Sequence, residues 1–219
     1  MKPDPTCPRC GRAVHAPNLW SSAWQCDAHG QVPPLNAVRG PNLTSLELVI
    51  GRANVPVWVP WPLPAGWVVT GFADAGDERS GAVAVAVALS GPAPLGGVGE
   101  MVTIAEEPGV GLGARVAAIE GPDPGTGFDT GAVHSKIRHD GHDIAMWSIQ
   151  GGEDRAVYVG EALADWMWFV LSPADTGVLM AELNGMRDLR DRHDGGATLD
   201  PPFGALSPFL STVLRPLRD

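Results

Sequence analysis

Apolar and polar residues alternate with a period of two through much of the middle of the chain. Residues 67–74 and 81–89 both follow this pattern, and the polar segment 76–80 between them is typical of a tight turn, so we expect a β-hairpin. In the second strand, alternate positions hold large and small apolar side chains, with Val83, Val85, Val87 and Leu89 on one side and Ala82, Ala84, Ala86 and Ala88 on the other. Because both faces are apolar, we predict a central strand that is covered on two sides.

Further strands and one helix are predicted after this hairpin. The strands are expected at residues 101–106, 133–139, 143–150, 155–160 and 165–171. The dipeptides Asp140-Gly141 and Gly151-Gly152 favour hairpin connections, so an antiparallel meander is the simplest topology. Ser172 and Pro173 are typical of a helix start, and an apolar stripe follows at Leu179, Leu183, Met186 and Leu189. We expect this helix to cover one face of the sheet.

The N-terminal segment carries two similar pairs of candidate metal ligands. Cys7 and Cys10 have C-x2-C spacing, Cys26 and His29 have C-x2-H spacing, and a glycine follows each pair. These residue types at this spacing are the ligands of zinc ribbons, and glycine lets the backbone turn so that both side chains reach one ion. We predict a closed Cys3His site with one structural Zn2+ ion. The alternatives are a chance spacing, or a disulfide between two cysteines with the third left free.

The predicted fold class is α+β, with a zinc ribbon followed by an antiparallel-sheet domain. We expect the ribbon over residues 1–35, a linker over 36–45, the sheet domain over 46–191 and a flexible tail over 192–219. A segment as short as the ribbon cannot bury enough apolar surface to fold alone, so the ion would supply its stability. The tail also contains apolar residues that could dock on the domain or on a partner.

Charge and composition restrict the partners. The chain is 44% hydrophobic and has a formal net charge of −10, and nearly all of the negative charge lies outside the ribbon. An acidic domain repels phosphate groups, which argues against nucleic-acid binding. The apolar runs are shorter than the roughly 20 residues that a membrane helix needs, and we expect no signal peptide because polar residues and prolines stand where one would place an apolar stretch. With all three cysteines assigned to the ribbon, we expect a cytoplasmic protein without a membrane span.

Two groups of side chains outside the ribbon are candidates for a ligand or partner surface. The first lies in a proline-rich segment and consists of Trp58, Trp61 and Trp67. We favour the interpretation that these tryptophans lie along the edge of their own sheet. The second surrounds one predicted hairpin and consists of His134, His139, Asp140, His142 and Asp143. These groups could bind a second metal or perform acid–base chemistry, although turn geometry alone explains most of them. We predict no catalytic residue.

Four segments carry a resemblance to a known family. They are residues 7–11, 26–30, 58–67 and 160–166. Together they resemble a family of uncharacterised actinobacterial proteins over nearly the whole chain. The resemblance implies no activity, substrate or partner.

Two functions compete on this basis. The first is a protein-interaction or adaptor module with structural zinc, in which the ribbon and the proline-rich segment face a protein partner. The second is a small-molecule-binding protein or enzyme whose pocket is lined by tryptophans, namely Trp58, Trp61, Trp67, Trp147, Trp166 and Trp168. We favour the first function, because the sequence lacks the signatures of the common hydrolases. The oligomeric state is not defined by the sequence.

Overall fold

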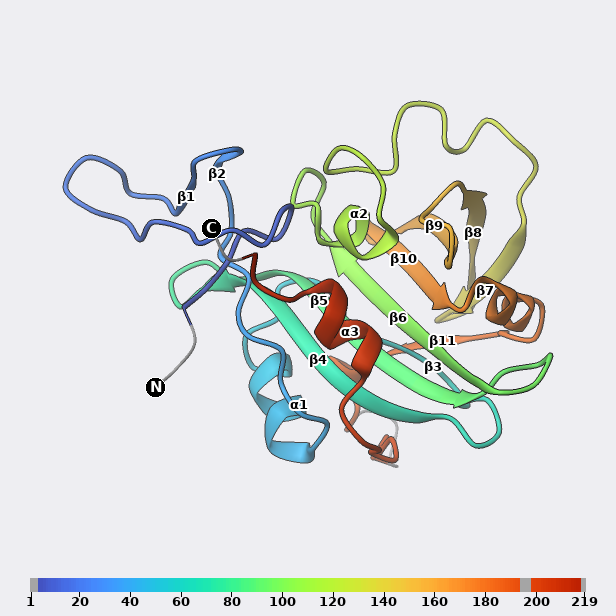
Figure 1. The fold of residues 1–219 in the computed structure, drawn as a ribbon. Helices are drawn as coiled ribbons and strands as arrows, with labels where there is room; N and C mark the ends of the chain where they lie inside the picture. The colour runs from blue at the N-terminus through green and yellow to red at the C-terminus, as the bar shows by residue number, and fades with distance from the viewer. Residues whose placement is uncertain (1–3, 194–197, 218–219) are drawn as a thin grey trace.

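The computed structural model describes residues 4–193 and 198–217, and a seven-stranded antiparallel sheet forms the centre of this part of the chain (Figure 1). The strands are β4 (Val68–Asp77), β5 (Gly81–Pro92), β6 (Val98–Glu106), β7 (Ser135–His139), β8 (His142–Ile149), β9 (Ala156–Ala162) and β10 (Asp165–Ser172). The predicted α+β fold class, the first hairpin and the five later strands are confirmed.

The strand order differs from the predicted simple meander. In the sheet the order is β4-β5-β6-β10-β9-β8-β7, so β6 pairs with β10 and not with the next strand along the chain. Residues 107–134 form a long connection to the far edge of the sheet, where β7 begins. The chain then returns strand by strand until β10 meets β6. This long-range pairing joins two antiparallel halves into one sheet.

The β5 strand has two buried faces, as its apolar pattern predicts, but the predicted alternation is wrong at its start, where Ala82 belongs to the first core and Val83 packs against the second. A register shift between β4 and β5 at this point leaves Val83 without a partner in β4. Val85, Val87 and Leu89 belong to one apolar core, and Ala84, Ala86 and Ala88 belong to a second core on the opposite face. Its neighbours β4 and β6 make it an interior strand. The small side chains of the alanine face leave room for elements packed close to the sheet, whereas the larger side chains of the valine face occupy more of the space beside it.

Each face of the sheet is covered by short elements. The first core includes residues of α1 (Leu43–Ile50), β3 (Trp58–Pro60) and β11 (Met186–Asp188), and β3 and β11 pair behind the sheet in Figure 1. The second core includes residues of α2 (Leu112–Ala117) and α3 (Pro208–Val213). Within the described ranges, no helix is long and apolar enough to cross a membrane.

The predicted helix after Ser172 is replaced by shorter elements. Ala174–Ala181 forms the 3-10 helix η1, the chain then extends into β11, and a second 3-10 turn, η2, spans Leu189–Asp191. The apolar stripe is correctly assigned to the core, because Leu179, Leu183, Met186 and Leu189 are all buried. The helix prediction is wrong because Met186 and its neighbours satisfy their backbone groups by pairing with β3.

Two segments outside the sheet pack against it. Residues 36–45, expected as a linker, follow the edge of β4, where Arg39 and Phe72 exchange two backbone hydrogen bonds, and lead into α1. In the segment expected as a flexible tail, α3 buries Leu210 in the second core. Residues 194–197 and 218–219 of that predicted tail lie outside the described residues. The division into domains stays a prediction.

The close packing between α2 and β10 can be tested at Gly113. A Cβ at Gly113 would overlap the indole of Trp168, so we expect Gly113→Ala to destabilise the protein by about 1–3 kcal/mol, despite the better helix propensity of alanine. Chemical denaturation measures this difference. Gly131→Ala is the matched control, because a Cβ at Gly131 meets nothing within 4 Å. Equal stability of the two variants would contradict the packing argument.

Candidate metal centre and the surface around it

The four predicted ligands come together at the N-terminal end of the chain. One ligand atom from each of Cys7, Cys10, Cys26 and His29 lies within 4.8 Å of all the others. His29 Nδ1 is 3.5 Å from Cys7 Sγ and 3.6 Å from Cys26 Sγ, and Cys10 Sγ is 3.8 Å from Cys26 Sγ. The cluster could therefore hold a metal ion.

Local backbone geometry explains why the ligands converge. Gly11 and Gly30, which follow the two ligand pairs, have φ angles of +76° and +66°, a region that favours glycine. Cys26 ends β1 (Gln25–Cys26), which pairs with β2 (Gly30–Gln31) and so forms a hairpin that contains the second ligand pair. The first pair lies in a turn closed by the bond from Gly11 N–H to Cys7 O.

The thiols are only partly accessible. Cys7 and Cys26 are buried, Cys10 is half-buried and His29 is exposed. Burial raises the pKa of the Cys7 thiol to about 12. An ion that takes this thiol as thiolate must therefore displace its proton. His15, the nearest other histidine in sequence, lies 3.2 Å from the Asp27 carboxylate and is not part of the cluster.

Hydrogen bonds anchor the ribbon to α2 and to the residues just before it, on the face of the sheet that carries the second core. Arg9 donates to the carbonyl oxygens of Gly109 and Val110, just before α2. Arg115, within α2, donates from Nη1 to Cys7 O at 3.1 Å. Thr6 exchanges two backbone hydrogen bonds with Leu35, and Gly76 N–H of β4 donates to the neighbouring Pro34 O at 2.9 Å. These contacts fix the first ligand pair against the domain.

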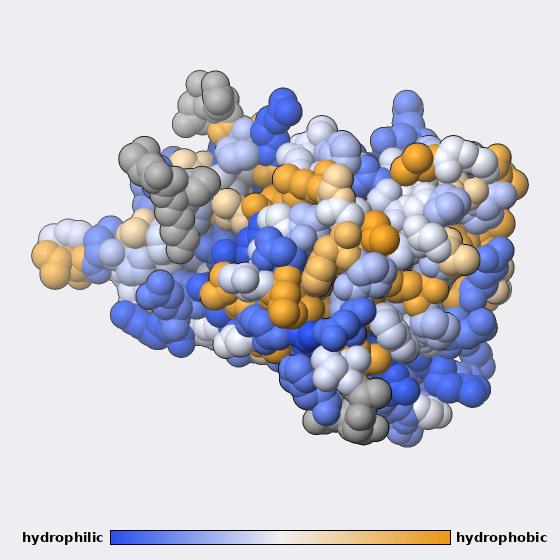
Figure 2. Space-filling view, turned by 90° about the horizontal axis from the view of Figure 1, so that it is seen from below, coloured by the Kyte–Doolittle hydropathy of each residue, from blue (hydrophilic) through white to orange (hydrophobic). Residues whose placement is uncertain are grey.

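The loop between the two ligand pairs projects away from the body of the molecule (Figure 1). It carries Leu19 and Trp20, which are 99% and 95% exposed. The Asn18 side chain accepts hydrogen bonds from the N–H groups of Trp20 and Ser21, and these bonds stabilise a turn at this point in the loop. In Figure 2, hydrophobic residues occupy the end of the projection on the left. We call residues 18–21 the apolar tip.

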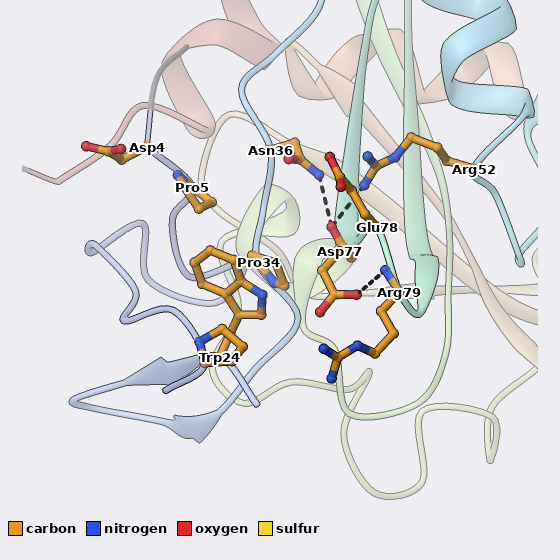
Figure 3. Close-up of a pocket in the computed structure, with 11 residues that line it drawn as sticks. Asp4, Pro5, Trp24, Pro34, Asn36, Arg52, Asp77, Glu78 and Arg79 are labelled. Atoms are coloured by element: carbon orange, nitrogen blue, oxygen red, sulfur yellow. Dashed lines mark hydrogen bonds between the residues drawn. The ribbon is translucent and has the colours of Figure 1, made fainter. Parts of the chain in front are cut away.

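A cleft of about 420 Å³ separates the ribbon from the turn between β4 and β5 (Figure 3). The Trp24 indole and Pro34 line one side, and Asp77, Glu78 and Arg79 from the turn line the other. A hydrogen bond from Ser80 N–H helps to hold the pKa of the Asp77 carboxyl below its usual value. A second hollow, also lined by Trp24, continues past it toward Ser22 and Ala23. Trp24 therefore stands between two adjoining hollows.

The histidines of the β7–β8 hairpin do not share one site. His139 lies edge-on to Trp58 with ring centroids 4.6 Å apart, and its Nδ1 is 3.3 Å from Met186 O. His134 instead packs against Tyr158, and the side chain of His142 is exposed. His139 does approach the Asp140 carboxylate at 3.5 Å. The turn explains this cluster better than a common ligand does, because Asp140 and Gly141 both have positive φ angles.

The predicted tryptophan pocket is divided by the sheet. Trp58 and Trp67 are buried in the first core, whereas Trp168 is buried in the second core on the other face. Trp61 is half-buried and lines a separate small hollow of about 190 Å³ with Leu183 and its neighbours. The six tryptophans therefore do not line one cavity, and the cleft beside Trp24 involves none of them.

Glu106 is a buried acidic residue whose role the sequence does not reveal. It ends β6 and is fully buried, and its carboxylate accepts hydrogen bonds from Leu112 N–H at 2.7 Å and Gly113 N–H at 3.1 Å. Burial raises the pKa of Glu106 to about 8, although these donors act in the opposite direction. The side chain thus fixes the start of α2, the helix that holds Arg115. The only sequence signal is an acidic residue at a strand end, shortly before a glycine-rich helix start.

A family comparison covers the ribbon and nearly all of the sheet domain. A family model described as "Family of unknown function (DUF6758)" matches residues 1–210. The chain belongs to this family. No curated protein and no solved structure matches the chain. DUF6758 membership thus agrees with the expected resemblance to uncharacterised proteins and brings no activity with it.

The buried Glu106 generates a prediction about pH. The folded state keeps a proton on Glu106 up to about pH 8, whereas the unfolded chain releases it near the ordinary value of 4.5. The contribution of this group to stability is therefore complete below about pH 4.5 and is lost as the pH rises to about 8, by an amount on the order of a few kcal/mol. We expect Glu106→Gln to remove this part of the pH dependence. Denaturation at several pH values measures it, and identical pH slopes in both proteins would refute the assignment.

Proposed function

We propose that the Cys3His cluster binds one structural zinc ion. In a tetrahedral site with Zn–S near 2.3 Å and Zn–N near 2.0–2.1 Å, neighbouring sulfurs lie about 3.8 Å apart and a sulfur lies about 3.5 Å from a nitrogen. The distances of 3.8 Å between Cys10 and Cys26, and of 3.5 and 3.6 Å from His29 to two sulfurs, fit these values. Thiolates and imidazole favour zinc over magnesium or calcium. Four protein ligands leave no position for substrate, so the ion acts on structure.

The function that the geometry supports best is protein interaction through the apolar tip. The observation that carries it is the nearly complete exposure of Leu19 and Trp20 on adjacent positions of a projecting loop. A tryptophan commonly contributes much of the energy of an interface when it enters a pocket on a partner. The Asn18 turn holds the tip in shape before binding, which lowers the conformational entropy lost on association.

The metal site would hold together the two ends of the loop that carries the apolar tip. Cys10 and Cys26 bound the loop on either side, and both belong to the cluster that would hold the proposed ion. The adjoining hollows beside Trp24 extend the same surface and could receive an extended segment of the partner. A reducing cytoplasm suits three cysteines that serve as ligands, and this location is part of the proposal.

A second candidate function is the binding of a small molecule in the cleft beside Trp24. The observation in its favour is the volume of about 420 Å³, which lies in the range of ligand sites. In this candidate the tryptophan-lined site lies at the border of the ribbon, and not in the sheet domain as predicted from the sequence. A small ligand would shift the indole NMR signal of Trp24 and would bind equally well without the apolar tip.

Metal analysis tests the zinc proposal directly. We expect about one equivalent of zinc in the purified protein and its loss in Cys10→Ser, because three remaining ligands bind far more weakly than four. Inductively coupled plasma spectrometry measures the content. His15→Ala is the matched control and should keep its zinc, since His15 lies outside the cluster. Freely reactive thiols with no bound metal in the native protein would end the proposal.

Exchange of the apolar tip tests the interaction function. We expect the double variant Leu19→Ser and Trp20→Ser to lose partner capture from source-cell lysate, while its zinc content and unfolding free energy stay unchanged because both side chains contact solvent. Quantitative mass spectrometry of captured proteins provides the measurement. Leu95→Ser removes another exposed apolar side chain, 70% exposed and distant in sequence, and serves as control. Equal capture by all three proteins would argue against the tip as the contact surface.

A further inference from the structure

The C-terminal segment of the described chain is hydrogen-bonded to the turn that contains the first ligand pair of the metal cluster. Leu217 N–H donates to Gly11 O at 2.9 Å, and Gly11 directly follows Cys10. This bond joins residues that are about 200 positions apart in sequence. The acceptor lies in the turn that closes around the metal ligands. Its position is therefore set by the same backbone that positions Cys7 and Cys10.

Arg115 joins the same two segments through its guanidinium. Nη1 donates to Cys7 O at 3.1 Å, while Nε donates to Val213 O at 3.1 Å and Nη2 to Arg215 O at 2.9 Å. One planar group thus holds three carbonyl oxygens, one from the ribbon and two from the end of α3 and the residues after it. A guanidinium suits this role because its donors diverge in a fixed plane.

Gly11 makes this approach possible. A Cβ at Gly11 would overlap the guanidinium of Arg115, and the φ angle of +76° also favours glycine. The Arg115 side chain therefore lies directly on the backbone of the ligand turn. A change in the conformation of that turn cannot leave the Arg115 contacts unaltered.

We infer that occupancy of the metal cluster controls the docking of residues 214–217. With the ion bound, the turn at Cys7 to Gly11 is fixed and presents Cys7 O and Gly11 O to Arg115 and Leu217. Without the ion, this short turn loses the ligand bonds that define it, and both acceptors lose their fixed positions. The segment then keeps α3 on the sheet through Leu210 but loses its bonds to the ribbon.

The coupling must act equally in both directions. If the ion stabilises docking of residues 214–217 by a certain factor, docking must strengthen ion binding by the same factor. The inference rests on the proposed metal site, yet it adds a separate claim, because a metal-bound ribbon could equally sit beside an independent C-terminal segment. Leu217 allows the two to be separated, since its side chain is 57% exposed and its contribution here is the backbone N–H.

Leu217→Pro is the decisive variant because proline has no N–H to donate. Leu217→Ala is the matched control, which shortens the side chain and keeps the N–H. We expect the zinc dissociation constant of the full chain, measured by competition with a chelator, to rise about fivefold or more in Leu217→Pro and to stay at the native value in Leu217→Ala. Arg115→Met should raise it further, since it removes three bonds at once.

Hydrogen exchange provides the reciprocal measurement on the native chain. Removal of zinc should increase exchange of the Leu217 amide at least tenfold, while amides of β5 keep their protection. Unchanged zinc affinity in Leu217→Pro, or equal protection of Leu217 with and without the ion, overturns the coupling and leaves the metal site standing. A chain that binds no zinc overturns both. Loss of protection throughout the sheet on zinc removal would indicate global unfolding and not local coupling. This result would also overturn the inference.

Discussion

The close packing of α2 against β6 and β10 is the constraint on which the contacts around the metal cluster depend. Ala84, Ala86 and Ala88 leave a shallow surface, and Gly113 lets α2 lie against the ring of Trp168. Because α2 lies this deep, Arg115 reaches both the ligand turn and the end of α3. The position of the ligand turn thus depends on a helix that lies more than 100 residues later in the sequence.

The parts of the fold that depend on local pattern are predictable from the sequence. The two ligand pairs converge because spacing and glycine position are short-range properties, and β5 is central because its own residues are apolar on both faces. The pairing of β6 with β10 has no local signal, since it joins segments separated by four other elements. Met186 shows the same limit: its burial follows from hydrophobicity, but its strand conformation depends on β3, more than 120 residues earlier.

The sequence predicts only part of the candidate interaction surface. Trp20 is almost fully exposed whereas Trp24 lines a cleft, and these different environments depend on tertiary structure. The three tryptophans of the proline-rich segment lie in or against the first core, whereas Trp168 is buried in the second core on the other face of the sheet. Glu106 and Arg115 illustrate the reverse case. Neither belongs to a recognisable motif, and each acts on backbone groups that only the folded chain brings within reach.

Closure of the loop between the ligand pairs has a consequence for variation in this family. Its ends meet at the Cys3His cluster, so an ion bound there would make the loop a closed ring whose length is not fixed by the sheet. Doubling the length of such a ring adds only about 0.6 kcal/mol of closure entropy. Insertions, deletions and exchanged residues between Ala16 and Ala23 should therefore be tolerated better than changes in the paired residues before them, where His15 exchanges two backbone hydrogen bonds with Gln25. The scaffold can keep its architecture while the length and residues of this loop change.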